Sequence, residues 1–513
     1  MTEFRVEEIA GITGGRLTST VAAQLTLAAS RISTDSRDCV PGSLYVAKLG
    51  EHADGHDFIA AALAAGAELV LAERELTDAS GQPYPAVIVP DAILAMGQLA
   101  AAVVQRIRDS RGPGEFTVIG ITGSAGKTTT KDLLAGVLSS AGPTVYPEGS
   151  YNGEVGVPLT VFRADETTRY LVVEMGATKI GNIAYLAQMV RPDIGVVLGV
   201  GSAHAGEFGG VENIAIAKGE LVEALPPGGT AVLNIADSRV AAMASRTSAR
   251  ILWFGETGVG AELVTETAAS VLRADQLHTD DQARPVFTLI LPDDSAYPVR
   301  SGLIGVHHVN NLLAAAAAAW AAGIPGDAIA RSLEGRGSAS RWRMERTDRP
   351  DGVTVINDAY NANPESMRAA LRALAELGRD ESGAPARRTW AVLGPMYELG
   401  EDSVREHDAL GQIVVRLNIS RLVVVGADAR PLHIGAINEG SWGDESVHLP
   451  DLESAYQLLG AELRPGDVVL FKSSRDAGLR HLGDRVAQAE ASESEGTAPR
   501  TPLTWSPMTA GED

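Results

Sequence analysis

The sequence has very little cysteine and fewer basic than acidic residues. Cys39 is the single cysteine among 513 residues, which rules out an intramolecular disulfide and suits a reducing compartment. With 43 Lys and Arg against 65 Asp and Glu, the formal net charge is -22. Such a chain has no basic surface with which to neutralise a polyanion, so we expect no nucleic-acid partner. The charge balance favours an enzyme whose few basic residues act locally on phosphates.

Long apolar runs and a signal peptide are also missing from the sequence. The longest apolar run, residues 312–322, is mostly alanine and falls well short of a membrane span. The N-terminal residues include Glu3, Glu7 and Glu8, where a signal peptide has a basic region and an apolar core. We therefore expect a cytoplasmic protein without membrane insertion.

The length of the chain and its alternation of predicted strands, helices and loops predict an α/β protein of about three domains. Residues 1–111 mix short strands with alanine-rich helices and end in a loop rich in Gly and Pro. Residues 112–335 alternate near-continuous apolar strands with helices, which is typical of a mainly parallel sheet covered on both faces. Residues 336–489 repeat that alternation, and we predict a second doubly wound unit of the Rossmann type there. Residues 490–513 are rich in Ser, Glu, Thr and Pro and are predicted to form a disordered tail.

The strands on which the argument depends can be placed from their apolar runs. In the second block they are predicted at 116–121, 170–174 and 194–198, and in the third at 353–356, 390–393, 422–425 and 468–471. A long helix is predicted after Asn311.

A glycine-rich loop between the first of these strands and a helix is the strongest functional signal. Converging backbone N–H groups and a helix N-terminus bind phosphate oxygens, Lys127 can reach the β- and γ-phosphates, and the Thr128 hydroxyl can bind Mg²⁺. The general pattern GxxxxGK[ST] requires glycine at 121, where this chain has Ile121. A tight turn that merely opens a helix is the alternative. The predicted nucleotide-binding residues are Gly123, Ser124, Ala125, Gly126, Lys127, Thr128 and Thr129.

Two polar residues follow neighbouring apolar strands. Glu174 closes one strand and His204 lies just past the other. Because ligands bind outside the carboxyl ends of parallel strands, both are expected to face the phosphate loop. A carboxylate there suits Mg²⁺, whereas imidazole is a less usual ligand for that ion. Solvated strand ends are the alternative for each residue taken alone.

Lys218 stands in an alanine-rich helical segment, where lysine is usually a solvated surface residue. An ammonium group cannot bind a metal. Only a change of charge, such as carbamylation by CO₂, would let Lys218 do so.

Further polar clusters follow the central block. Asn311 suits a helix N-cap, and its amide could instead bind an adenine edge. Asp358 and the residues up to Pro364 indicate a turn and an N-cap, or a ligand site at the end of a strand. Arg341 and Arg343 precede them and could meet a phosphate during transfer. Residues 472–475 form a further anion-binding geometry at a helix start.

Together these motifs resemble the Mur ligase family, the ATP-dependent amide-forming ligases of peptidoglycan synthesis, over all but the acidic tail. Residues 41–47 and 54–58, with the segment Ser33, Thr34, Asp35, Ser36 and Arg37, are similar to the family's UDP-sugar-binding domain. The loop matches the family's TGSxGKTT form, which explains Ile121. Residues 173–177, 191–193 and 207–209 resemble the family's central domain.

The resemblance implies roles for individual residues. It implies that Thr128 and Glu174 bind one Mg²⁺ and that His204 and a carbamate on Lys218 bind a second. It further implies that Asn311 binds adenine and that Asp358 binds ribose. Catalytic roles are thereby expected for Lys127, Glu174, His204, Lys218 and Arg341. Substrate contacts are expected for Asn152, Tyr360, Asn361 and Asn363, besides residues 33–37.

The chain departs from the family pattern at three places. Ser150 and His308 each stand where asparagine is usual, so only Asn152 is carried over from the first of these motifs. The arginine after the central domain follows serine rather than glycine. We assign that role to Arg341, and Arg343 is the alternative.

Segment 358–364 is the most specific marker within the family. It resembles the member that joins D-alanyl-D-alanine to UDP-N-acetylmuramoyl-tripeptide, with ATP and two Mg²⁺. An Asp-Asn-Pro-Arg motif, usual in the diaminopimelate-adding member, is missing from the last block. We expect a monomeric ligase of this kind. The alternatives are another Mur-type amide ligase, a folylpolyglutamate synthase, which lacks a UDP-sugar domain, or a nucleotide-dependent binding ATPase.

Overall fold

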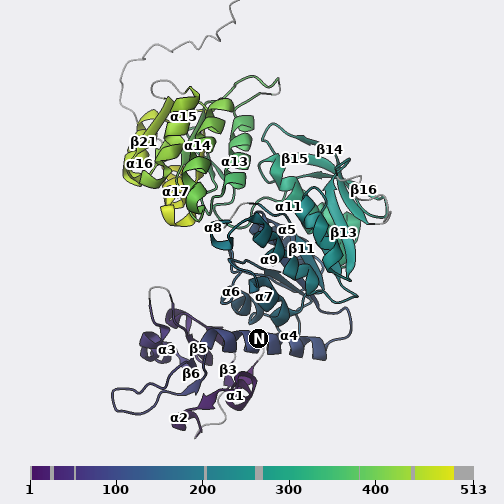
Figure 1. Cartoon of the computed structure of the whole chain (residues 1–513), viewed down its shortest axis with the longest axis vertical. Coiled ribbons are helices and arrows are strands. Elements are labelled where there is room, and N and C mark those ends of the chain that lie inside the picture. The colour runs from purple at the N-terminus through teal and green to yellow at the C-terminus, as the bar shows by residue number, and fades with distance from the viewer. Residues whose placement is uncertain are drawn as a thin grey trace, which may run out of the picture.

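The chain forms three α/β units, as the sequence predicts (Figure 1). The computed structural model describes residues 3–22, 28–29, 31–50, 53–201, 205–259, 270–380, 382–440 and 445–489. Each of the three larger sheets falls within one of the predicted blocks. The block boundaries themselves stay predictions, and the acidic tail lies outside the described residues.

The N-terminal unit is built on a five-stranded sheet that is parallel except at β2. In spatial order its strands are β2 (Arg16–Leu17), β7 (Ala86–Ile88), β6 (Ala67–Ala72), β5 (Ser43–Ala47) and β4 (Arg31–Ser33). A two-stranded antiparallel pair, β1 (Phe4–Arg5) and β3 (Ala28–Ala29), lies beside it. The helices of this unit are α1 (Val6–Thr13), α2 (Ser19–Ala22) and α3 (Ile59–Ala65).

Helix α4 (Ala92–Ser110) joins the N-terminal unit to the central one (Figure 1). It contacts α1 and β5 on one side and α6 (Gly156–Val161) and α7 (Asn182–Val190) on the other. At its C-terminal end Arg108 pairs with Asp193 at 2.9 Å, and Asp193 also accepts the Val118 N–H at 2.8 Å. The apolar core therefore runs without interruption from the first sheet through α4 into the second.

The central unit holds a nine-stranded sheet. Its spatial order is β16 (Ala296–Arg300), β15 (Pro285–Ile290), β14 (Val271–Thr279), β13 (Arg250–Glu256), β12 (Thr230–Asn234), β11 (Ile194–Val197), β8 (Thr117–Thr122), β10 (Tyr170–Glu174) and β9 (Thr144–Val145). Pairing is parallel from β9 to β14 and antiparallel at β15 and β16. The three strands predicted from the apolar runs are confirmed within about one residue at each end.

Helices cover both faces of the central sheet, which explains why its inner strands β10, β11 and β12 are buried throughout. One face carries α5 (Lys127–Ser139), α11 (Val309–Ala321) and α12 (Gly326–Leu333), and the other carries α6, α7 and α9 (Val211–Glu223). Alanines 314–319 of α11 are fully buried, so this helix lies close to its neighbours. The short helices α8 (Ala205–Phe208) and α10 (Ser238–Ala242) complete the unit.

The C-terminal unit is the predicted second doubly wound sheet. Its order is β17 (Glu345–Asp348), β18 (Thr354–Asn357), β22 (Val468–Lys472), β19 (Thr389–Leu393), β20 (Arg421–Val425) and β21 (Ser446–Leu449), and β17 alone is antiparallel. Helices α13 (Pro364–Leu377), α14 (Ser403–Arg416) and α15 (Arg430–Glu439) cover one face. Helices α16 (Leu452–Glu462) and α17 (Leu479–Gln488) cover the other.

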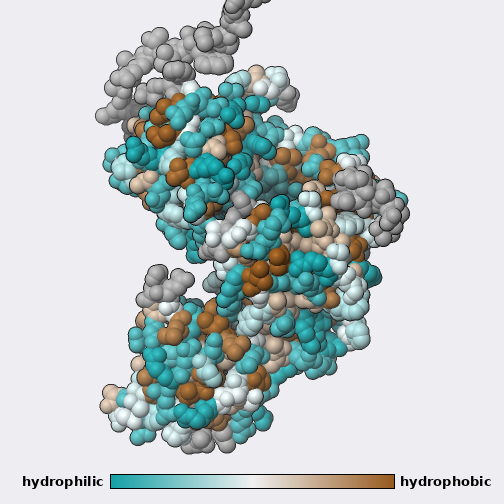
Figure 2. Space-filling model, in the orientation of Figure 1, coloured by the Kyte–Doolittle hydropathy of each residue, from teal (hydrophilic) through white to brown (hydrophobic). Residues whose placement is uncertain are grey.

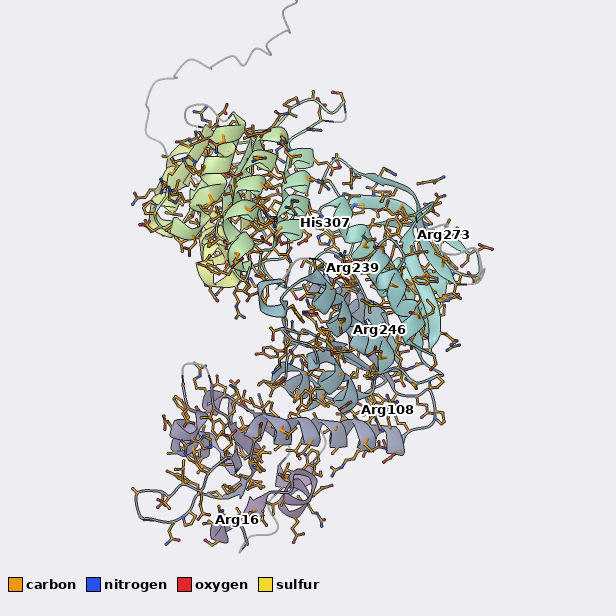
Figure 3. All side chains as sticks on the ribbon, in the orientation of Figure 1. Arg16, Arg108, Arg239, Arg246, Arg273 and His307 are labelled. Atoms are coloured by element: carbon orange, nitrogen blue, oxygen red, sulfur yellow. The ribbon has the colours of Figure 1, made fainter. Side chains whose placement is uncertain are left out.

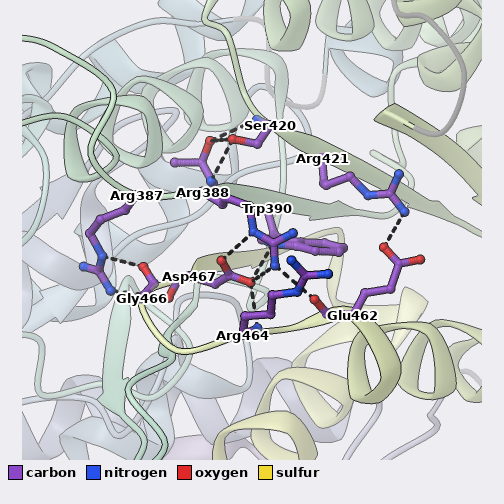
Figure 4. Close-up of polar contacts among 10 residues, drawn as sticks. Arg387, Arg388, Trp390, Ser420, Arg421, Glu462, Arg464, Gly466 and Asp467 are labelled. Carbon is purple, nitrogen blue, oxygen red and sulfur yellow. Dashed lines mark hydrogen bonds and ion pairs between the residues drawn. The ribbon is translucent and has the colours of Figure 1, made fainter. Parts of the chain in front are cut away.

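A buried carboxylate organises the end of this sheet away from its carboxyl edge (Figure 4). Asp467 pairs with Arg388 at 2.6 Å and accepts the Trp390 indole N–H at 3.1 Å and the Arg464 backbone N–H at 2.9 Å. The charge is thus fully satisfied within the C-terminal unit.

Among the described residues no helix is both long and apolar enough to cross a bilayer. The face seen in Figure 2 is mostly hydrophilic, with apolar residues in small groups.

Histidine 407 should make the C-terminal unit sensitive to acid. Its Nδ1 donates to Ser403 O at 2.7 Å while Nε2 accepts the Met396 N–H at 2.9 Å, so the neutral ring is fully bonded. Burial lowers the pKa of His407 below its usual 6.5. The unfolded chain then binds the extra proton more readily, so this stability is present above about pH 6.5 and is lost as the pH falls.

The free energy of unfolding, measured with urea, should decrease less between pH 7 and pH 5 in His407→Gln than in the wild type. The wild-type loss should approach about 1.4 kcal/mol per pH unit from this group. His278→Gln, at an exposed histidine, is the control and should leave the wild-type pH dependence unchanged. Equal pH dependence in wild type and His407→Gln would contradict the assignment.

Candidate active site

The phosphate loop connects β8 to α5 at the carboxyl edge of the central sheet. Ile121 belongs to the buried strand, so the loop begins after it and needs no glycine there. Gly126 has φ +82° and serves as the N-cap of α5. A Cβ at Gly126 would collide with Asn311 Oδ1, and one at Gly123 would lie 2.8 Å from Leu198 Cβ. Both glycines are therefore required by close packing as well as by conformation.

Thr128 and Glu174 form the polar centre of the site. The Thr128 hydroxyl donates to Glu174 Oε2 at 3.0 Å, and the other carboxylate oxygen accepts the Asn152 amide at 2.9 Å. Ser150 Oγ lies 2.7 Å from Thr128 Oγ1. Glu174 is only 1% exposed. These oxygen donors fit Mg²⁺, which binds one or two carboxylates and completes its shell with water and phosphate oxygens.

Two lysines line the same cavity as Thr128 and Glu174. Lys127 Nζ donates to Gly123 O at 2.7 Å, and burial lowers its pKa. Lys218 on α9 is 4% exposed, so the surface alternative for it is wrong. Burial, and next the charge of Lys127, hold the pKa of Lys218 well below its usual value. No described residue offers Lys218 Nζ a hydrogen bond or an ion pair.

A complete metal centre is not visible in the described part of the chain, where no three His, Cys, Asp or Glu side chains gather. His204, predicted as a metal ligand, lies outside the described residues.

Asn311 lies against the loop rather than capping a helix. Helix α11 begins at Val309 and its N-cap is His308, so the N-cap alternative for Asn311 is wrong. The Asn311 amide bonds to His308 Nδ1 at 3.0 Å, while His308 Nε2 is buried with no partner in the described structure. His307 precedes it where the central and C-terminal units meet (Figure 3). Burial lowers the pKa of His307 to about 4, so the ring is neutral at pH 7.

The C-terminal unit supplies the opposite wall. Asp358 follows β18 and pairs with Lys472 at 2.5 Å, so one of the two cations in segment 472–475 already has an anionic partner. The anion-binding role of that segment stays a prediction. Asn363 is the N-cap of α13 and forms a capping box with Ser366, which confirms the turn and N-cap interpretation. Tyr360 and Asn361 lie between these two positions.

Arg343, not Arg341, reaches the site. Its Nη2 donates to Thr128 Oγ1 at 3.2 Å and to Ser150 Oγ at 3.3 Å, its guanidinium stacks on Tyr360 at 4.2 Å, and its Nε is buried with no described partner. Arg341 pairs instead with Asp484 at 2.9 Å, and its side chain is 58% exposed. The structure therefore does not bring Arg341 to the site and favours the alternative.

One cavity of about 1090 Å³ unites these groups. It lies between the central and C-terminal units, and its wall includes most of the predicted site residues: Ser124, Ala125, Gly126, Lys127, Thr128, Thr129, Asn152, Glu174, Lys218, Asn311, Asp358, Tyr360, Asn361 and Asn363. Among the described residues of the N-terminal unit, Ile93 of α4 alone lines the cavity. A site of this size accommodates a nucleotide.

The predicted UDP-binding segment lies apart from this cavity. Ser33 ends β4, and Asp35 caps a short turn by accepting the Arg37 N–H at 2.9 Å. Hydrogen bonds from Arg37 lower the pKa of Asp35 to about 2. Thr34 and Ser36 lie in the same turn. Their role stays a prediction.

Sequence reasoning missed the parts played by Ser150 and His308 at the cavity. Both looked like departures from a pattern, and only their contacts reveal a role. Segment 472–475 was predicted to bind an anion, but the pairing of Lys472 with Asp358, 114 positions away, could not be predicted from the sequence.

This fold and site define a phosphate-loop nucleotide enzyme with a second α/β unit that completes the nucleotide cavity. Family models match the chain in three places: "Mur ligase family, catalytic domain" over 29–111, "Mur ligase middle domain" over 121–319 and "Mur ligase, glutamate ligase domain" over 342–475. The chain belongs to the Mur ligase family.

Individual relatives agree with this assignment. The chain is 44% identical to the UDP-N-acetylmuramoyl-tripeptide–D-alanyl-D-alanine ligase of Mycobacterium tuberculosis, with 95% of this chain and 98% of that protein covered. It is 32% identical to the enzyme of that name from Escherichia coli, with 94% and 98% covered. The crystal structure of MurF from Acinetobacter baumannii superposes with a TM-score of 0.81 at 29% identity, covering 95% and 100%. MurF from Thermotoga maritima in complex with ADP gives 0.73 at 26% identity, covering 89% and 97%.

Substitution of Gly126 tests the nucleotide site. Gly126→Ala places a methyl group against Asn311 in a left-handed conformation. Strain of about 1–3 kcal/mol predicts roughly 5- to 150-fold weaker binding of ATP. Binding is measured with a fluorescent ATP analogue in the presence of Mg²⁺.

The matched control is Gly153→Ala. Gly153 also lines the cavity, but a Cβ there meets nothing within 4 Å. Its affinity should stay close to that of the wild type. Equal affinities of the two variants would contradict the assigned role of Gly126.

Proposed function

We propose that this chain is an ATP-dependent ligase that joins D-alanyl-D-alanine to UDP-N-acetylmuramoyl-tripeptide, giving the UDP-N-acetylmuramoyl-pentapeptide of peptidoglycan synthesis. The observation that carries the proposal is the single cavity shared by Lys127, Glu174 and Asp358. The relatives at 44% and 32% identity bear the name of this ligase. Cytoplasmic location and a monomeric state stay predictions.

ATP binds with its phosphates at the loop and its nucleoside toward Asn311. The backbone N–H groups at the start of α5 and the Lys127 ammonium bind phosphate oxygens. The unpartnered His308 Nε2 and the amide of Asn311 can bind the adenine edge, and Asp358 can accept the ribose hydroxyls. A Mg²⁺ held by Thr128 and Glu174 would screen the charge between the phosphates and the attacking carboxylate.

The reaction then has two steps. The terminal carboxylate of the tripeptide attacks the γ-phosphorus, the bond to ADP breaks, and an acyl phosphate forms. The amine of D-alanyl-D-alanine attacks the acyl carbon, loses a proton, and inorganic phosphate leaves. Arg343 lies where it can stabilise the charge of the phosphate in transfer. The nucleotide bridges the central and C-terminal units, so their closure would keep water from the acyl phosphate.

Lys218 is proposed to act as a carbamate. Its lowered pKa leaves a larger share of neutral amine, which can attack CO₂ and release a proton. The new anion removes the cost of a buried, unpaired ammonium beside Lys127. It would also supply an oxygen ligand for a second Mg²⁺, together with His204.

Phosphate release is the direct test of the function. We expect release from ATP only when UDP-N-acetylmuramoyl-tripeptide and D-alanyl-D-alanine are both present, with the pentapeptide product found by mass. Rapid hydrolysis without the substrates would instead support a binding ATPase. Ligation of a single amino acid to a UDP-N-acetylmuramoyl-dipeptide would instead support the tripeptide-forming ligase.

Removal of Lys218 tests the carbamate. We expect Lys218→Ala to lower kcat by at least about a hundredfold, because a charged group at the reacting centre is lost. Added acetate should restore part of the activity by placing a carboxylate in the vacated space. Arg239→Ala, at a basic residue on α10 outside the cavity wall, is the control and should keep full activity. Unchanged activity of Lys218→Ala would refute the carbamate.

A further inference from the structure

The segment that carries Arg343 is held at both of its ends by buried aspartates. Before Arg343, the Ser340 backbone N–H donates to Asp132 Oδ2 of helix α5 at 3.0 Å. After Arg343, the Met344 N–H donates to Asp358 Oδ1 at 3.0 Å. One aspartate comes from the central unit and the other from the C-terminal unit.

Each of these aspartates is paired with a buried lysine. Asp132 pairs with Lys131 at 2.5 Å, and Asp358 pairs with Lys472 at the same distance. Lys131 is 1% exposed and Asp132 is 7% exposed. Buried ion pairs add little stability on balance, because desolvation offsets their attraction. Because each pair bonds one end of this short segment, we infer that the two pairs fix its position.

Lys131 extends the first of these pairs to a second loop. Its Nζ donates to Pro147 O at 3.0 Å and Gly149 O at 3.2 Å. This loop leads into Ser150 and Asn152, which bind Thr128 and Glu174. The Lys131–Asp132 pair thus holds two separate parts of the cavity wall against the helix that begins at the phosphate loop.

The backbone of segment 340–344, whose two ends bond to these aspartates, is strained. Trp342 has φ +60° and Met344 has φ +53°, in the left-handed region that non-glycine residues rarely adopt. This alternation turns the Arg343 side chain toward Thr128 and the Arg341 side chain toward Asp484. Strained backbone persists only where its surroundings hold it, and here Asp132 and Asp358 do so.

We propose that Asp132, which is paired with Lys131, is a positioning residue for the ligation reaction. It holds segment 340–344 so that the Arg343 guanidinium stays at the phosphate loop. The proposal rests on the ligase function proposed above. Asp132 itself is not part of the described cavity wall, so its effect on the reaction acts through segment 340–344.

A double-mutant cycle between Asp132 and Arg343 tests the proposal. Asp132→Ala should lower kcat by about 10- to 100-fold, because a displacement of about 1 Å at a reacting centre costs up to a hundredfold. Asp132→Asn keeps an acceptor for the Ser340 N–H and should retain more activity than Asp132→Ala. In an Arg343→Gln background, Asp132→Ala should lower kcat by less than about twofold further, because coupled residues are not additive. Fully multiplicative effects would overturn the proposal.

Asp467→Asn is the matched control for damage to a buried ion pair. Asp467 is buried like Asp132 and its carboxylate is fully hydrogen-bonded (Figure 4). It is not among the described residues of the cavity wall. Its variant should lower the melting temperature and leave kcat per folded enzyme unchanged. A loss of kcat equal to that of Asp132→Ala would mean that any weakened core has this effect, and would also overturn the proposal.

Hydrogen exchange provides a readout that does not depend on activity. In the wild type the Ser340 amide should exchange slowly, and in Asp132→Ala it should exchange at least about tenfold faster. The amides of helix α5 itself should exchange as in the wild type. An unchanged exchange rate of the Ser340 amide in Asp132→Ala would refute the proposal that Asp132 holds segment 340–344, even if the wild type is an active ligase. If the wild type showed no ligation but the Ser340 amide still exchanged faster in Asp132→Ala, the proposed ligase function would be refuted and the positioning role of Asp132 would stand.

Discussion

Parallel pairing of β8 with β10 and β11 is the constraint on which the site depends. It aligns Glu174 with Ile121 and Val197 with Thr122, so three strands end at one edge of the sheet. The phosphate loop, the carboxylate of Glu174 and the segment leading to His204 leave the sheet at that edge. Everything else at the cavity is arranged around them, including the lysine of α9 and the asparagine of α11.

Residue pattern was enough to predict the sheets and much of the cavity. The strands after which Glu174 and Asp358 stand are runs of buried apolar residues, and their position at strand ends follows from the α/β alternation. The burial of Lys218 could not be predicted in this way, because an alanine-rich helix looks alike on a surface and in a core. The resemblance to a family, and not the pattern, reversed that interpretation.

The choice between Arg341 and Arg343 shows where sequence reasoning ends. Both are arginines in one short segment, and no periodicity distinguishes them. What distinguishes them is a left-handed backbone at Trp342 and Met344. That backbone is held by Asp132, 208 positions before Ser340, and by Asp358, 14 positions after Met344. Asn311 is not an N-cap for a different, local reason: a short 3-10 turn at Val306–His308 precedes the helix, which starts at Val309.

The uninterrupted core through α4 has a consequence for how the molecule loses its structure. Nine residues of this helix are buried, some against the first sheet and some against α6 and α7. Separating the N-terminal unit would expose apolar surface on both pieces at once. We therefore expect the first two units to unfold as one cooperative body. The C-terminal unit is built on two other core clusters, one of which also includes Ala283 and Ile304 of the central unit.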